Sequence, residues 1–194
     1  MDTSVNTSVN NLVGTTPTGV PAVLRRLYFV RFAFAAAWAA LLFATADTLG
    51  PVSATLLVVY PLFDVTAAVV DLRSARANGG AAPALLVNIV ISSLAAVGLA
   101  VAATSGIPAA LRVWGVWAVV SGLVQLVAGS VRRTLGGQWA MIISGAISTF
   151  AGASFFTQAG SGDPTLRNLA GYAFLGGVFF LVSAFRLDRA HTRA

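Results

Sequence analysis

Cysteine, lysine and glutamate are absent from this chain of 194 residues, and histidine occurs only once. A chain without cysteine forms no disulfide and offers no thiolate as a nucleophile or metal ligand. The single histidine, His191, stands near the C-terminus and cannot alone build a catalytic triad or a two-histidine metal site. We therefore expect no catalytic residues, no metal and no cofactor, and we predict that the protein is not an enzyme.

Charge is also scarce along the chain. Charged residues make up only 9% of the sequence, whereas hydrophobic residues make up 57%. Soluble domains typically have about 25% charged and about 45–50% apolar residues. A chain so poor in charge and so rich in apolar side chains is predicted to be an integral membrane protein.

Six segments have about the 20 apolar residues that are needed to cross a bilayer. They are residues 27–45, 52–72, 84–103, 109–131, 137–157 and 166–185. The segments are continuously apolar, whereas strands of a membrane barrel alternate between apolar and polar residues. Short loops of glycine, proline and aspartate separate them and suit antiparallel neighbours. The predicted fold class is therefore all-α, a polytopic membrane bundle of six transmembrane helices.

The ends of the chain differ in composition from these spans. Residues 1–24 are rich in serine, threonine and asparagine, without an apolar period, and predict a disordered polar tail. Residues 25–186 form the predicted six-span transmembrane domain, and residues 187–194 form a short basic tail. A secretory signal begins with basic residues, whereas Arg25 and Arg26 come only after the polar tail, so we expect the first apolar segment to be retained as a span.

The basic residues indicate the orientation in the membrane. All 12 are arginines, and only Arg112 and Arg167 fall on one side of the predicted spans. Since basic loops stay in the cytoplasm, both termini are predicted to be cytoplasmic. This asymmetry accounts for the net charge of +6 and suits anionic membrane lipids; we expect no nucleic-acid partner. The aromatic residues fit a belt at each interface, with Tyr28 and Trp139 inside and Trp114, Trp117 and Tyr172 outside.

Three of the spans resemble one another. Aligning Tyr60, Trp117 and Tyr172 superposes the segments "YPLFDVTAAVVDLR", "WAVVSGLVQLVAGSVR" and "YAFLGGVFFLVSAFR". Each has an aromatic residue, then small or polar residues four and five positions later, and then an apolar run that ends in arginine. Internal repeats of this kind build many membrane folds. We predict three repeated helical hairpins, formed by spans 1–2, 3–4 and 5–6.

Small residues recur at helical spacing on two neighbouring spans. They are Gly115, Gly122 and Gly129 on span 4, and Ser144, Ser148 and Gly152 on span 5. Helices in lipid associate by close backbone approach, which small residues allow. We interpret these positions as helix-packing faces, while a ligand groove lined by thin helix faces is the alternative.

The six short spans, the repeated aromatic and small-residue pattern and one long segment resemble the HdeD family of bacterial acid-resistance membrane proteins. The segment is "LRVWGVWAVVSGLVQLVAGSVRRTLGGQWAMIISGAISTFAGASFF", and the resemblance extends over residues 24–186. It implies a multi-pass protein of the bacterial cytoplasmic (inner) membrane with a non-enzymatic role in acid or stress resistance or envelope maintenance. It carries over no catalytic residue. Val65 follows Asp64, where similar proteins often place glycine.

A few polar residues are predicted to lie within the membrane. The strongest are Asp64, Asp71 and Arg31, with Asn88 and Gln125 as weaker members. At 1.5 Å per residue, Arg31 is predicted about 6 Å and Asp64 about 12 Å from the inner ends of their spans. Because a charge at the centre of a span costs roughly 2.5–3.5 kcal/mol, we expect Arg31 and Asp64 to form a pair.

Two interpretations of this pair stay open from the sequence. It is a structural clamp between spans 1 and 2, or Asp64 is a protonatable site in a small transporter or channel for protons, lipids or apolar solutes. A proton pump normally uses a chain of acids, and this sequence has one deep acid per chain. Assembly into a homo-oligomer would bring several together. An intramembrane aspartyl protease would need a second facing aspartate, which the sequence lacks.

Overall fold

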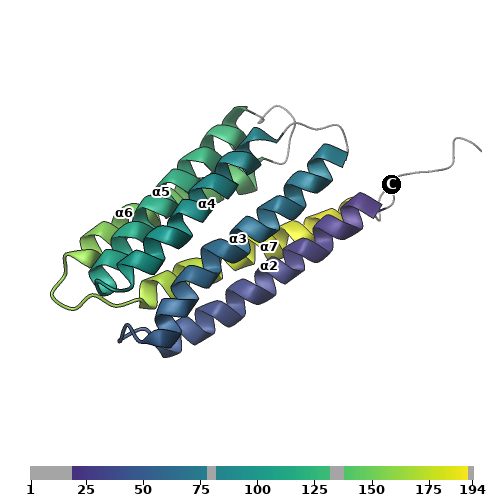
Figure 1. The fold of residues 1–194 in the computed structure, drawn as a ribbon. Helices are drawn as coiled ribbons and strands as arrows, with labels where there is room; N and C mark the ends of the chain where they lie inside the picture. Colours follow the sequence, from purple (N-terminus) through teal and green to yellow (C-terminus); the bar gives the residue numbers. More distant parts are fainter. Residues whose placement is uncertain (1–18, 78–81, 132–137, 192–194) are drawn as a thin grey trace, which may run out of the picture.

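The computed structural model describes residues 19–77, 82–131 and 138–191, and within these ranges the chain forms six α-helices. They run side by side along one long axis (Figure 1). All six are long and apolar enough to cross a membrane, so the chain is an all-α, multi-pass membrane protein. The helices are α2 (Gly19–Ala44), α3 (Pro51–Ala77), α4 (Pro83–Ala102), α5 (Ile107–Val131), α6 (Trp139–Ala159) and α7 (Arg167–His191).

The helix ends lie close to the boundaries predicted from the apolar segments, with differences at both ends of the chain. Helix α2 begins at Gly19, within the predicted polar tail, whose residues 1–18 lie outside the described residues. Helix α7 continues through part of the predicted basic tail to His191, and residues 192–194 lie outside the described residues. Hydrogen bonding within a helix satisfies backbone groups in lipid, which explains why apolar segments of this length fold as helices.

Proline and glycine mark the starts of three helices. Pro51 and Pro83 are the first residues of α3 and α4, where a missing backbone N–H costs nothing. Gly106 precedes α5 with a φ of 97°, a left-handed conformation that side chains disfavour. These residues make the tight turns that let successive helices run antiparallel.

The closest helix pairs are α5 with α6, α2 with α7, and α3 with α4. Contacts within the predicted hairpins, α2 with α3 and α6 with α7, are sparser. Each pair of closest neighbours therefore joins one predicted hairpin to the next, and α7 returns to pack against α2. The sequence pattern did not reveal that the tightest packing lies between the predicted hairpins.

Glycines create the contact between α5 and α6. A Cβ atom added at Gly115 would lie 2.8 Å from the carbonyl oxygen of Gly152, and one added at Gly122 would lie 2.6 Å from that of Gly145. At Gly129 it would lie 2.8 Å from a side-chain carbon of Ile142. Distances this short leave no room for a side chain at any of these positions. The three predicted glycines of span 4 and Gly152 of span 5 do form a packing face.

The other two predicted packing residues of span 5 face elsewhere. Ser144 and Ser148 lie in the wall of a cavity rather than against α5. Gly145 and Thr149 occupy the contact with Gly122 instead. Ser144 and Ser148 form a second stripe of small residues on α6, which lines the cavity. Ser148 is also buried and accepts a hydrogen bond from Tyr172 of α7, while the packing role of Ser144 stays a prediction.

The prediction of an outer aromatic belt also needs correction. Trp114 is fully buried, and its ring centroid lies 5.3 Å from that of Trp38, on which it stacks, and 5.1 Å from that of Trp117, which it meets edge-on. Tyr60 joins the same group, 4.6 Å from Trp38. Aromatic rings in such edge and offset arrangements attract one another beyond the area they bury. These four rings, the aromatic cluster, form the centre of the core and do not lie at an interface.

Trp38 also supports α3 at the point where a proline interrupts it. Pro61 lies inside α3 and is buried, and it cannot donate to the helix ladder. The indole N–H of Trp38 donates to the carbonyl oxygen of Leu56 over 2.6 Å, one residue before the carbonyl that Pro61 leaves without a helical donor. This contact fixes α2 against the weakened turn of α3.

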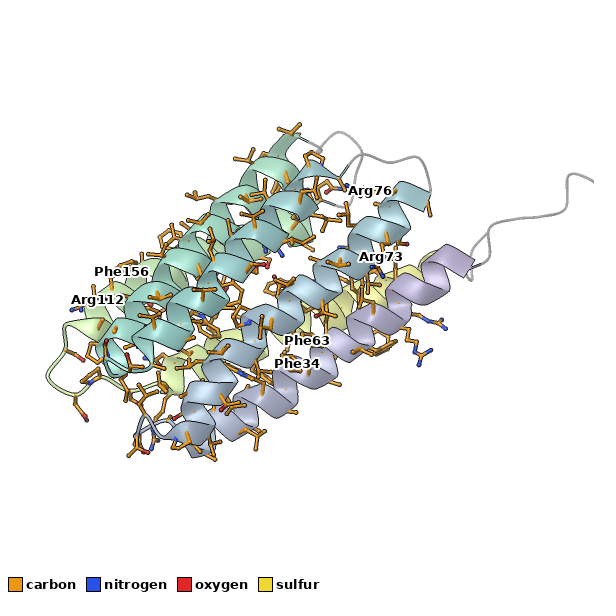
Figure 2. All side chains as sticks on the ribbon, viewed as in Figure 1. Phe34, Phe63, Arg73, Arg76, Arg112 and Phe156 are labelled. Atoms are coloured by element: carbon orange, nitrogen blue, oxygen red, sulfur yellow. The ribbon has the colours of Figure 1, made fainter. Side chains whose placement is uncertain are left out.

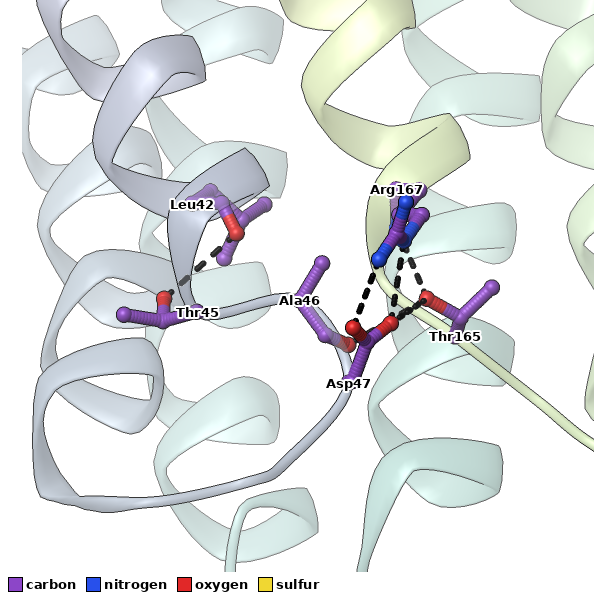
Figure 3. A network of polar contacts seen from close by, with 6 residues as sticks. All are labelled: Leu42, Thr45, Ala46, Asp47, Thr165 and Arg167. Carbon is purple, nitrogen blue, oxygen red and sulfur yellow. Dashed lines mark hydrogen bonds and ion pairs between the residues drawn. The ribbon is translucent and has the colours of Figure 1, made fainter.

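An ion pair closes one end of the bundle. The guanidinium of Arg167, at the start of α7, donates to Asp47 over 2.6 and 3.0 Å (Figure 3). The hydroxyl of Thr165 donates to Asp47 over 3.4 Å, and the backbone N–H of Leu166 donates to the carbonyl of Ala46 over 3.1 Å. The hydrogen bond from Arg167 holds the pKa of Asp47 below its usual range. Both side chains are largely exposed, so water and salt screen the pair.

The arginines separate towards the two ends of the molecule. Arg76 and Arg112 lie at opposite ends of the bundle (Figure 2). Arg112 and Arg167 stand near the starts of α5 and α7, whereas Arg73 and Arg76 stand near the end of α3. The end with Arg73 and Arg76, called the arginine-rich end below, is the one that the sequence predicts to be cytoplasmic.

Cysteine labelling tests this orientation, because the chain has no cysteine of its own. Ala77 and Ser161 are both exposed and lie at opposite ends of the bundle. In intact cells, a membrane-impermeant maleimide should label a cysteine at Ser161 and not one at Ala77, and both should react after lysis. Labelling of both positions in intact cells would contradict the orientation with both termini in the cytoplasm.

Candidate functional site

Asp64 lies in the middle of α3, and its carboxylate accepts hydrogen bonds from two other helices. The amide of Asn88 and the hydroxyl of Ser92, both on α4, donate to Oδ2 over 2.7 and 2.9 Å. The guanidinium of Arg31, on α2, donates to Oδ1 over a longer distance of 3.4 Å. Hydrogen bonds to a carboxylate are strongest near 2.7–2.9 Å, so the neutral donors make the closer contacts. Asp64 is thus held by a mixed set of donors rather than by an ion pair alone.

A second ring of contacts holds this set in place. The indole N–H of Trp117, on α5, donates to the hydroxyl oxygen of Ser92 over 3.1 Å. Ser92 is fully buried, and its hydroxyl in turn donates a hydrogen bond to Asp64. A continuous chain of polar contacts therefore links α3, α4 and α5, in a part of the bundle where unpaired polar groups are costly.

Arg31 contacts α7 as well as Asp64. Its guanidinium carbon lies 4.7 Å from the ring centroid of Phe180, within the range of a cation–π interaction. Its Nε atom is buried and has no hydrogen-bond partner among the described residues. The guanidinium of Arg31 therefore connects α2 to both α3 and α7, while its buried Nε–H donates to no described residue.

Asp71 is the second acid on this face of α3. It follows Asp64 by seven residues, which places it two helical turns, or about 10 Å, closer to the arginine-rich end. Its Oδ1 atom is buried and has no hydrogen-bond partner among the described residues. The two acids thus differ in their surroundings. Asp64 accepts hydrogen bonds from three donors, whereas one oxygen of Asp71 has no partner among the described residues.

These side chains line one cavity of about 730 Å³ between the six helices. Sites for small molecules usually measure about 300–1,000 Å³, so the cavity is large enough for an organic ligand. All of the predicted intramembrane polar residues stand in its wall, together with the two serines of α6; they are Arg31, Asp64, Asp71, Asn88, Gln125, Ser144 and Ser148. The structure therefore gathers the polar residues of the spans around a single space.

The cavity runs from the middle of the bundle to the arginine-rich end. Tyr60 and Trp117 line its deep part, where the aromatic cluster begins. Ser74, Ala82 and Ala140 line its other end, each close to the end of a helix. Beyond Tyr60 and Trp117 the bundle is filled by buried side chains such as Trp38 and Trp114. The arrangement is that of a pocket with a closed, aromatic base.

Positions that align in the repeated sequence meet at this cavity. Tyr60, Trp117 and Tyr172, the three aromatic residues of the alignment, all line it. Arg31 and Asn88 precede Tyr60 and Trp117 by the same number of residues, and both also line it. Arg31 and Asp64 come from the first predicted hairpin, and the neutral residues Asn88 and Ser121 stand at the matching places of the second.

Several contact residues were not identified from the sequence. Ser92 donates to Asp64, and Tyr172 donates through its hydroxyl to Ser148 over 2.9 Å. Ser121 lines the cavity, and its buried hydroxyl has no hydrogen-bond partner among the described residues. The repeat alignment contained a signal for one of them, since Ser121 stands at the position that matches Asp64.

Comparison with known proteins gives no assignment. No protein-family model matches the chain, and no curated protein or solved structure matches it either. The geometry of the cavity therefore carries the functional argument, together with the resemblance seen in the sequence.

Proposed function

We propose that this chain is a non-enzymatic membrane protein of the HdeD type that binds a small solute in its central cavity and so contributes to acid or stress resistance, or to envelope maintenance. The observation that carries the binding role is the cavity itself, about 730 Å³ in volume and lined by convergent polar and aromatic side chains. The stress role and the bacterial cytoplasmic membrane come from the sequence resemblance.

The packing of the helices supports a bundle of three related hairpins around this cavity. The closest helix pairs are those between successive hairpins, with α7 packed against α2, as expected for three repeats that close into a ring. Aligned residues of all three hairpins contribute to the wall. In this arrangement both termini are cytoplasmic, and the arginine-rich end of the cavity faces the cytoplasm.

A small transporter is the second candidate, and one observation favours it. Asp64 is an acid in the middle of α3 that lines the cavity while it accepts hydrogen bonds from α2 and α4. Intramembrane acids of this kind mark many solute and proton pathways. Protons, lipids or apolar solutes would then move past Asp64, and the aromatic cluster beyond it would have to open during transport.

Filling the cavity tests the proposed function. In an acid-sensitive bacterial strain that expresses the chain, Ser144→Trp, which places an indole in the cavity, should reduce survival after acid shock to the level of the empty vector. Ala153→Trp adds the same ring to an exposed position of the same helix and should preserve survival. Immunoblots of membrane fractions would establish equal amounts of both variants.

Two results would oppose the proposal. If the unchanged chain gave no protection against acid or other envelope stress, the resistance role would be rejected. If Ser144→Trp protected as well as the unchanged chain at equal expression, the cavity would have no part in the function.

A further inference from the structure

The charges in the cavity wall do not balance. Among the described residues, the charged ones that line it are Asp64, Asp71 and Arg31, two carboxylates and one guanidinium. One negative charge is therefore left over in this pocket between the membrane-spanning helices. The exposed side chains of Arg73 and Arg76 lie outside the cavity wall, where solvent and anionic headgroups can neutralise them.

The surplus charge belongs to Asp71. Asp64 has Arg31, Asn88 and Ser92 as donors. Asp71 presents a buried oxygen atom that has no hydrogen-bond partner in the described part of the chain. A buried carboxylate oxygen without a partner is costly, and a positively charged group beside the carboxylate reduces that cost.

Aromatic rings surround the path from Asp71 to the base of the cavity. Tyr28 and Phe180 line the wall on the side of Asp71, and Tyr60, Trp117 and Tyr172 line the deeper part. The faces of aromatic rings attract cations, as Arg31 already shows by lying 4.7 Å over Phe180. The rings also offer apolar area to the body of a ligand, and a space of about 730 Å³ exceeds what a bare metal ion or a proton would need.

We propose that the cavity takes up a monovalent organic cation, an ammonium or similar group with an apolar or aromatic body, with its charge beside Asp71 and its body against the deeper aromatic rings. This inference rests on the proposed role of the cavity in binding a solute and names the class of that solute. An organic anion is disfavoured, since it would add a second uncompensated charge to the same space.

Three probes of similar shape and different charge test the inference: the cation tetraphenylphosphonium, the anion tetraphenylborate and the neutral triphenylmethanol. Binding is measured at equilibrium to the full chain in lipid nanodiscs, with the uptake of protein-free nanodiscs subtracted. We expect phosphonium to bind at least about tenfold more tightly than borate, and Asp71→Asn to weaken phosphonium binding by about tenfold while leaving triphenylmethanol unaffected. Asp47→Asn, which removes an exposed carboxylate at the other end of the bundle, should leave all three unchanged.

The outcomes separate this inference from the proposed function. The cation proposal would be overturned if phosphonium did not bind, or if phosphonium and borate bound equally well. It would also be overturned if Asp71→Asn bound phosphonium as tightly as the unchanged chain. If Ser144→Trp then still abolished triphenylmethanol binding, the cavity would remain a binding site for neutral solutes. If no probe bound, or Ser144→Trp left the binding of every probe unchanged, the solute-binding role would itself be rejected. The unfolding temperature of Asp71→Asn, measured alongside, should equal or exceed that of the unchanged chain, because the change removes an uncompensated charge and this oxygen has no hydrogen bond to lose.

Discussion

Replacing Gly122 with leucine should cause the largest loss of stability of any single change in the transmembrane bundle. A Cβ atom at Gly122 would already lie 2.6 Å from the carbonyl oxygen of Gly145 and 2.6 Å from the hydroxyl oxygen of Thr149. The oxygen of Gly145 is part of the α6 backbone, and Thr149 also meets this position with a backbone atom. These atoms cannot move aside without separating α5 from α6. Overpacking a well-filled interior costs about 1–3 kcal/mol, and here the loss should reach or exceed the upper end. Thermal unfolding in detergent measures it.

A matched substitution separates crowding from a general effect of leucine. Gly171, on α7, is exposed, and a Cβ atom there would meet nothing within 4 Å. Gly171→Leu should therefore leave the unfolding temperature nearly unchanged. Val127→Leu, on the exposed face of α5 itself, should also do little. Equal losses from Gly122→Leu and Gly171→Leu would show that α5 and α6 do not pack through their glycines.

The spans could be predicted from sequence because their cause is local. A run of apolar residues long enough to cross the membrane must satisfy its own backbone groups, and only a helix does so within one segment. The approach of Arg31 to Asp64 also followed from local geometry, since the depth of each residue along its helix depends on its distance from the end of the span.

Rotation of each helix about its axis could not be predicted in the same way. Ser144 and Gly145 are neighbours in sequence, yet one faces the cavity and the other faces α5. Small residues at helical spacing occur on both stripes, so spacing alone does not identify the one that packs. Trp114 shows the same limit, because an aromatic residue near the end of a span suits an interface belt as well as a buried core. Contacts with other helices decide both cases.

Removing Asp64 should destabilise the protein more than removing Arg31. The closest charged atoms of the two residues are 3.4 Å apart, and the side chain of Asp64 is 22% exposed while that of Arg31 is 11% exposed. Asp64→Leu would leave the guanidinium of Arg31 and the amide of Asn88 without their acceptor. Arg31→Leu would leave Asp64 with Asn88 and Ser92 still donating. Breaking a fully buried pair costs about 3–5 kcal/mol, and the partial exposure of this pair places Asp64→Leu near the lower end.

The double change distinguishes a structural clamp from a site that exists for function. If Arg31 and Asp64 stabilise each other, Arg31→Leu combined with Asp64→Leu should lose less stability than the two single changes added together, because neither charge is then left uncompensated. Recovery should be incomplete, since Asn88 and Ser92 still lack their acceptor.

Asp64→Asn supplies the other half of the test. If Asp64 is a protonatable functional site, this change should abolish acid protection or transport with little change in unfolding temperature. If Asp64 is part of a clamp, the change should lower the unfolding temperature as well. Strictly additive losses in the double variant, measured by thermal unfolding under one set of conditions, would reject the clamp and leave the carboxylate of Asp64 as a group that the cavity keeps for its ligand or for a proton.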